Sequence, residues 1–192
     1  SNVVIGTAAA ENLTEGDQNT YVGAYAGEEA TTAEYNAIVG YNAGGGGSSS
    51  AATGNYNAAL GFAALQNTTT GYQNIAVGSF AMQSTTEGDS NVAVGYQALD
   101  ANTTGTDNVA IGRDALGSNV DDDGSVAVGR NSLRIANNTG SAGVSYNTAL
   151  GTNSGYNVTL GTQNTLLGYS AGFGVTEGLS NSCLGINAGY GL

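Results

Sequence analysis

The chain has 192 residues, of which only 9% are charged, and its net charge is −12. Its three basic residues are too few to displace counterions from nucleic acid or to dock on anionic lipid. The absence of His and the single Cys exclude His-based catalytic triads, His-ligated metal sites and an internal disulfide. No apolar run reaches the ~20 residues that span a bilayer. We therefore expect no cofactor, no nucleic-acid partner and no membrane insertion.

A repeat of 17 residues organises the whole sequence. Its marker is Asn-x-x-aliphatic-Gly, and eight of the ten intervals between marker glycines are 17 residues, the others being 21 and 22. The marker glycines are Gly6, Gly23, Gly40, Gly61, Gly78, Gly95, Gly112, Gly129, Gly151, Gly168 and Gly185. Repeats of about this length, with short strands and tight turns, are typical of a stacked coil. The sequence predicts an all-β fold, a parallel β-solenoid of about eleven 17-residue rungs, with residues 1–192 as a single repeat array.

One short strand is predicted immediately before each marker glycine. The residues one to three before the glycine, such as Val92, Ala93 and Val94 before Gly95, belong to this strand. The residues one and three before the glycine are aliphatic or small, and we expect them to point together into a narrow core. The residue between them is also apolar, which predicts that a neighbouring chain covers that second face. After the glycine we expect a turn, a second short strand and a polar return.

Asparagine stands four residues before the marker glycine in ten rungs, and Ser125 replaces it in the other. The ten residues are Asn2, Asn19, Asn36, Asn57, Asn74, Asn91, Asn108, Asn147, Asn164 and Asn181. Asn tolerates left-handed turns, and its amide can bond to the equivalent residue one rung away. The pattern predicts a structural Asn ladder, with a row of sugar-binding amides as the alternative.

Two insertions, near residues 41–54 and 131–146, account for the two longer intervals. The first is rich in Gly and Ser and is predicted to be a spacer. The second is accompanied by Arg130, Arg134, Asn137 and Asn138, and a repeat protein places variation where it meets partners. These four residues are the candidates for binding a glycan or a neighbouring part of a fibre.

The acidic run Asp121, Asp122 and Asp123 is the densest charge cluster. Carboxylates at a turn can hold Ca²⁺, but a solvated acidic turn is the favoured interpretation, because regularly spaced Asp is lacking. The other acids also lie in polar returns, whereas glycoside hydrolysis needs paired carboxyls in a cleft. We expect the protein not to be an enzyme. Thr recurs in the returns, which leaves an ice-binding solenoid as a further alternative.

The run Asn91 to Leu99, Asn-Val-Ala-Val-Gly-Tyr-Gln-Ala-Leu, followed by Asn102-Thr-Thr-Gly105, resembles repeats of two related kinds. One kind forms the heads of trimeric autotransporter adhesins, and the other occurs in bacteriophage tail fibres and related surface fibres. The resemblance extends through all eleven rungs and implies a left-handed parallel β-roll in which three chains share one axis. The adhesin repeat is usually shorter, so the longer return here is closer to the phage-fibre kind.

These observations predict a homotrimeric structural fibre segment of a host-attachment or adhesion device. Its location is expected to be extracellular, on a virion tail fibre or a bacterial cell surface. The expected partners are two identical chains, with a cell-surface glycan or other fibre proteins as further candidates. The sequence opens on a motif Asn and stops in mid-rung, from which we expect a segment of a longer fibre. A carbohydrate-binding trimeric adhesin head is the second hypothesis and an ice-binding solenoid the third.

Overall fold

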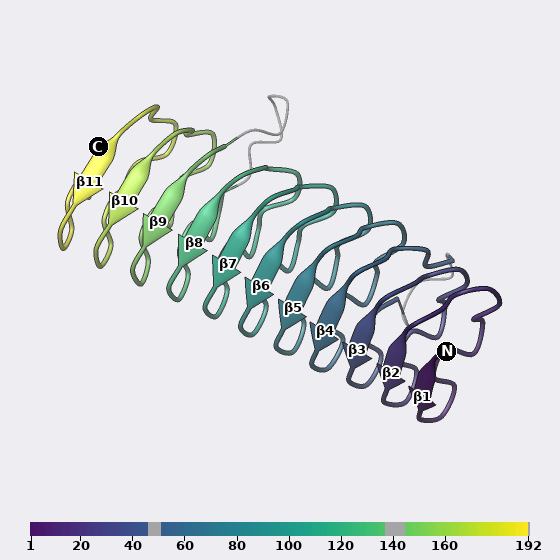
Figure 1. Cartoon of the computed structure of the whole chain (residues 1–192). Coiled ribbons are helices and arrows are strands. Elements are labelled where there is room, and N and C mark those ends of the chain that lie inside the picture. The colour runs from purple at the N-terminus through teal and green to yellow at the C-terminus, as the bar shows by residue number, and fades with distance from the viewer. Residues whose placement is uncertain (46–50, 137–144, 192) are drawn as a thin grey trace.

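The computed structural model describes residues 1–45, 51–136 and 145–191 as a rod of stacked coils with the two termini at opposite ends (Figure 1). Eleven three-residue strands form one parallel sheet in strict chain order. They are β1 (Val3–Ile5), β2 (Thr20–Val22), β3 (Ala37–Val39), β4 (Ala58–Leu60), β5 (Ile75–Val77), β6 (Val92–Val94), β7 (Val109–Ile111), β8 (Val126–Val128), β9 (Thr148–Leu150), β10 (Thr165–Leu167) and β11 (Ser182–Leu184). The predicted all-β parallel β-solenoid with its 17-residue spacing is confirmed.

Each strand residue pairs with its counterpart one repeat further along the chain. Val92 of β6 lies opposite Val109 of β7, and the same register holds across the first insertion, where Ala37 pairs with Ala58. It also holds across the second, where Val126 pairs with Thr148. The sheet therefore remains regular across both longer intervals.

The direction in which the strand residues point was predicted wrongly. The middle residue of each strand from β2 to β11 is buried, as Ala93 of β6 is, while its two neighbours face outward. Ile75 and Val77, on either side of Ala76, are exposed, whereas Ala76 is fully buried. With apolar residues on both faces of a three-residue strand, the alternation cannot by itself distinguish inside from outside. The aliphatic columns predicted for the core form the outer face of the sheet.

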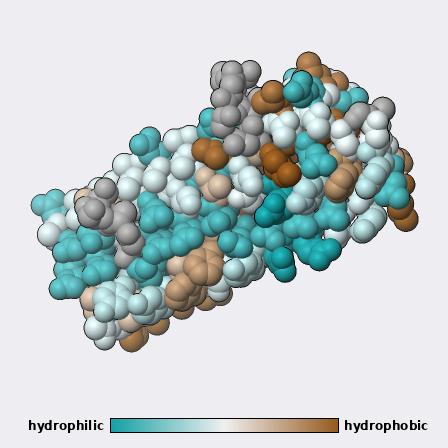
Figure 2. Space-filling model, turned by 180° about the vertical axis from the view of Figure 1, so that it is seen from behind, coloured by the Kyte–Doolittle hydropathy of each residue, from teal (hydrophilic) through white to brown (hydrophobic). Residues whose placement is uncertain are grey.

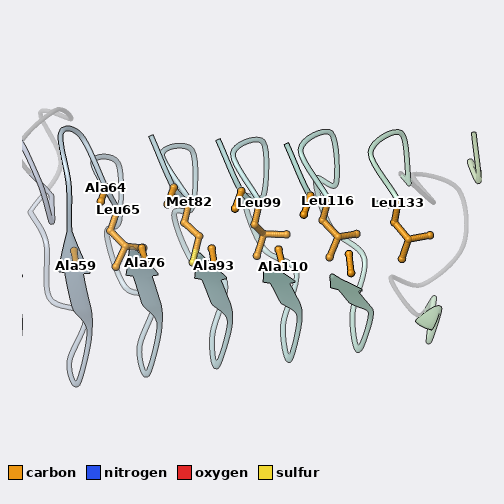
Figure 3. Packing of buried hydrophobic residues seen from close by; sticks show 14 of the residues in the cluster. Ala59, Ala64, Leu65, Ala76, Met82, Ala93, Leu99, Ala110, Leu116 and Leu133 are labelled. Atoms are coloured by element: carbon orange, nitrogen blue, oxygen red, sulfur yellow. The ribbon is translucent and has the colours of Figure 1, made fainter. Parts of the chain in front are cut away.

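The core lies between the strands and the segment that returns after each marker glycine. Figure 3 shows Leu65, Met82, Leu99, Leu116 and Leu133 reaching from this segment toward the alanines of the strands. All five side chains are fully buried. The core is therefore only one large side chain thick.

Two consecutive turns replace the second strand predicted after the marker glycine. In the β6 rung, Ala98 donates its N–H to Gly95 and Asn102 donates to Leu99, each three residues apart. Gln97 and Leu99 adopt left-handed conformations, with φ of 53° and 52°. Such residues reverse the chain within a few positions, so the coil closes without a second strand.

Candidate functional site

The Asn ladder is an internal hydrogen-bonded column. Asn91 Oδ1 accepts the N–H of Asn108 at 2.9 Å, and Asn91 Nδ2 donates to the carbonyl of Gly105 at 2.8 Å. The same two bonds recur from rung to rung, and Asn91 is fully buried. Because backbone groups use both ends of the amide, this column has no polar groups to offer a sugar.

Ser125 substitutes for Asn in the β8 rung with a shorter side chain. Its N–H still donates to Asn108 Oδ1 at 2.9 Å, but its own Oγ accepts the N–H of Asn147 over a longer 3.3 Å. The ladder therefore continues through this rung with a weaker bond.

The acidic run does not form a common site. Asp122 is buried where most rungs carry glycine, and its N–H donates to Asn119 Oδ1 at 2.9 Å. Asp123 Oδ1 accepts the N–H and the hydroxyl of Thr106. In residues 1–45, 51–136 and 145–191, no group of three or more His, Cys, Asp or Glu lies close enough to hold a metal ion. The three acidic residues therefore do not form a common set of metal ligands.

The return threonines also bond within the molecule. The hydroxyl of Thr69 donates to the carbonyl of Thr86 at 3.0 Å, and that of Thr86 donates to Thr103. Thr103 continues the column by donating to Val120. These hydroxyl protons are therefore engaged along the rod and do not form a free array facing water.

Two of the four candidate ligand-binding residues can be placed. Arg130 is exposed directly after the marker glycine of its rung, and the guanidinium of half-buried Arg134 lies 6.0 Å from the ring centroid of Tyr156. Asn137 and Asn138 lie outside the described residues. The candidate cluster of four is thus reduced to two arginines on neighbouring turns.

A ladder of aromatic side chains, absent from the sequence predictions, follows the strands β2 to β6. It consists of Tyr25, Tyr41, Phe62, Phe80 and Tyr96, each on one rung, one or two residues after the marker glycine. Neighbouring ring centroids are 5.1–5.9 Å apart. A signal for it existed in the sequence, because Tyr41, Phe62 and Tyr96 share one column of the repeat.

A second aromatic stack continues along the same side of the rod. Phe173 stacks on Tyr156 at 5.4 Å and on Tyr190 at 5.0 Å, five residues after their marker glycines. The two columns are neighbours, because Gln97 Nε2 and Asp100 Oδ2, two and five residues after Gly95, approach to 3.5 Å. We call the residues at positions one, two and five after the marker glycines the turn edge.

The turn edge also carries two acids near its centre. Arg113 Nε contacts Asp114 Oδ2 at 2.9 Å. Burial raises the pKa of the Asp100 carboxyl, the Gln97 hydrogen bond lowers it, and the charge of Asp114 raises it again. The hydrogen bond and the ion pair each lie within one rung, and the charge of Asp114 acts on Asp100 of the preceding rung.

The outer face of the sheet is an apolar strip along the rod. Its exposed side chains are Val3, Ile5, Val39, Leu60, Ile75, Val77, Ile111, Leu150 and Leu184. Figure 2 shows hydrophilic residues over most of the central band of the back of the rod, with hydrophobic residues gathered along one margin and at one end. The apolar surface is therefore concentrated, and it is available for contact with another molecule.

The buried amides of the Asn column are hydrogen-bonded, as at Asn91, whereas Oδ1 of the buried Asn102 accepts no hydrogen bond from the described residues. The described part of the chain contains no helix long and apolar enough to cross a bilayer. The strip on the sheet and the turn edge are the two candidate functional surfaces. Comparison with protein-family models, with curated proteins and with solved structures gives no match to this chain.

Proposed function

We propose that this chain is a non-enzymatic, homotrimeric fibre segment of a host-attachment device on a bacteriophage tail fibre or a related bacterial surface fibre. The observation that carries the proposal is the apolar strip on the outer face of the sheet. Nine aliphatic side chains are exposed there, and they follow the sheet from β1 to β11. Soluble monomers rarely expose apolar patches of this extent.

Association of identical chains along this strip stabilises the rod. Burying the exposed part of each aliphatic side chain contributes about 1 kcal/mol, because full burial of such a residue contributes ~1.5–3 kcal/mol. The strip repeats with the rungs, so parallel copies bring like rungs together over the length of the sheet. The number three and a left-handed coil rest on the resemblance of the repeat to phage-fibre and adhesin-head repeats.

The interior of the rod supports a spacing role. About ten rung steps at the ~4.8 Å strand separation give a rod about 50 Å long. Each rung is bonded to the next through backbone, Asn and Thr groups, as at Asn91 and Asn108. A continuously bonded rod of this kind resists bending and holds two ends of a fibre apart.

Sedimentation equilibrium tests the association. The native chain is expected at three times its 18.9 kDa mass. The double variant Val77→Asp/Leu150→Asp places charge in the strip and should shift the chain to monomer. The matched control Thr70→Asp/Thr104→Asp adds the same charge at exposed return positions and should remain trimeric. A native chain that stays a folded monomer or forms a dimer contradicts the proposal.

A carbohydrate-binding head is the second candidate function. The exposed aromatic ladder of the turn edge favours it, because rings half-open to solvent suit the apolar faces of sugars. Titration with oligosaccharides tests it.

A further inference from the structure

We propose that the turn edge binds a linear carboxylated oligosaccharide, with the aromatic ladders stacking on sugar rings and the arginines between them pairing with carboxylates. The proposal goes beyond the spacing role and does not depend on trimer formation. It rests on the placement of aromatic and basic side chains along this one edge.

The first aromatic ladder is accessible and regular. Tyr41, Phe62 and Tyr96 are each about half exposed, with 50%, 47% and 48% of their surface open. Tyr41 and Phe62 are parallel and stacked on each other, with 4° between their ring planes, and the other ring pairs meet edge to face. The step between rings is comparable to the length of one pyranose unit, so a linear sugar chain can keep in register with the rungs.

All basic residues of the chain lie on the turn edge, on two adjacent rungs. Arg113 and Arg130 occupy the same column as Tyr41, Phe62 and Tyr96, directly after their marker glycines. Arg134 lies in the column of the second stack, over Tyr156. From β2 to β11 the edge therefore runs from aromatic rings through three guanidinium groups to aromatic rings again.

The local charge favours an anion despite the net charge of −12. Asp114 neutralises Arg113, with which it forms an ion pair. Within the described residues Arg130 and Arg134 form no salt bridge, so their guanidinium donors remain available. Other acids of the edge are Asp100, one rung before Arg113, and Glu11 and Glu28 on the first two rungs. The centre of the edge is thus the place where a carboxylate finds two cations that form no salt bridge with the described residues.

Carboxylated sugar fits this edge better than other anions do. Arg binds carboxylates through paired hydrogen bonds, and aromatic rings present apolar faces that match pyranose C–H groups. A nucleic acid offers bases for stacking, but its phosphate density is repelled by a chain with 15 acidic residues and three basic ones. An acidic peptide could pair with the arginines, because Arg clusters recognise acidic motifs, but its backbone offers no apolar ring faces to the aromatic ladders.

Isothermal titration with the hexamers of galacturonate, hyaluronan and sialic acid tests the proposal. We expect at least one of them to bind, and to bind about tenfold more tightly than its neutral methyl ester. Arg130→Gln/Arg134→Gln should weaken binding about tenfold, and Phe62→Ala/Tyr96→Ala about fivefold or more. Each variant is checked by thermal unfolding, so that loss of binding is separated from loss of fold.

The control variant is Tyr56→Ala. Tyr56 stacks on Tyr35 at 4.9 Å and is 56% exposed, but it lies at the opposite ends of the strands. Its removal deletes an equivalent ring and should leave binding unchanged. Failure of all three hexamers to bind, equal weakening by Tyr56→Ala, or equal affinity for a thymidine hexanucleotide or a hexaglutamate peptide overturns the proposal. The strip variant Val77→Asp/Leu150→Asp should keep its affinity per chain, so failure of the trimer is recognised separately.

Discussion

Tyr21 occupies the space that a side chain at Gly27 would need. A Cβ added to Gly27 would lie 2.2 Å from the Tyr21 ring, and one added to Gly172 would lie 2.5 Å from Leu166 Cδ2. Where the strand residue is small, as at Ala93, the equivalent return residue is large, as at Leu99. In the rungs of β2 to β8 and of β10, one large core side chain is therefore donated either by the strand or by the return segment. In the β9 rung, where Ala149 and Gly155 are both small, Leu133 and Leu166 of the neighbouring rungs border Gly155.

This reciprocity predicts a strong coupling between the two positions. Ala93→Leu overfills the core and should cost about 2 kcal/mol, and Leu99→Gly leaves a cavity that costs about 3 kcal/mol. The double variant reproduces the arrangement of Leu166 and Gly172 and should lie within about 1 kcal/mol of the native chain. Urea unfolding at one fixed chain concentration measures all three.

A matched pair on distant rungs provides the control. Ala93→Leu combined with Leu133→Gly places the added and deleted volumes two rungs apart, and their costs should add. If the stability costs of Ala93→Leu and Leu99→Gly also add in the neighbouring pair, the two side chains do not compete for the same space in the core, and the expected coupling is wrong.

The Asn ladder predicts a second set of stability changes. Asn91→Ala leaves the N–H of Asn108 unpaired inside the rod and removes the shorter of the two amide bonds to the Gly105 carbonyl, at a cost of about 2 kcal/mol. Ser125→Asn should instead stabilise by about 1 kcal/mol, because it restores an acceptor of full length. The exposed Asn12→Ala serves as the control, and chemical denaturation compares them. Equal costs for Asn91→Ala and Asn12→Ala would contradict a stabilising ladder.

Substituting a marker glycine by Ala should destabilise the protein more on an inner rung than on the terminal rung. Gly95 has φ of 140°, and a Cβ there would lie 2.6 Å from the carbonyl oxygen of Gly112. Gly185 has φ of 118°, but no described atom lies within 4 Å of its added Cβ. Gly185→Ala therefore carries only backbone strain, about 1–2 kcal/mol, while Gly95→Ala adds a clash with backbone and should exceed about 4 kcal/mol. Thermal melting followed by circular dichroism ranks the two variants. Equal losses of stability would show that the positive φ, and not the lack of space for a Cβ, is the reason for glycine at these positions.

Tyr21 predicts an alkaline limit to stability. Burial raises the pKa of its hydroxyl from 10.0 to about 12, against a smaller lowering by a hydrogen bond with Asn36. Above pH 10 the unfolded chain loses this proton and the folded chain retains it, so the contribution is complete below pH 10 and disappears as the pH rises to about 12. The loss approaches about 3 kcal/mol.

Urea midpoints measured between about pH 9 and pH 12 test this expectation. Tyr21→Phe should show a flatter decline than the native chain, because it lacks the buried hydroxyl while the ten other tyrosines are present in both proteins. Parallel declines of the two proteins would show that the buried hydroxyl does not limit stability in alkali.

Much of the fold could be predicted from the sequence because the 17-residue repeat fixes where each rung begins and ends. The spacing of marker glycines such as Gly95 and Gly112 places the strands, because each observed strand ends at the residue before a marker glycine. The Asn column could be located in the same way, because the residue type recurs at one position. Because the same residue pattern recurs in eleven rungs, a departure from it at a single residue does not obscure the repeat.

Contacts between rungs were harder to predict. Tyr25 and Phe80 stand two residues after their marker glycines and Tyr41 one, so no single column of the repeat contains the whole aromatic ladder. The stacking arises because rungs are about 5 Å apart, which lets rings in adjacent columns meet. The concentration of all three arginines on the turn edge likewise becomes visible only when the turns are aligned in space.

The sequence by itself determined the solenoid, its period, the strand positions and the glycines and asparagines at its turns. Only the tertiary structure decided which strand face is the core, because Val92, Ala93 and Val94 are all apolar and either face could have been buried. The short Ala93 points inward because Leu99 approaches it from a left-handed turn and already fills the interior. Packing volume across a core one side chain thick therefore sets the orientation, and it leaves the larger aliphatic residues on the surface.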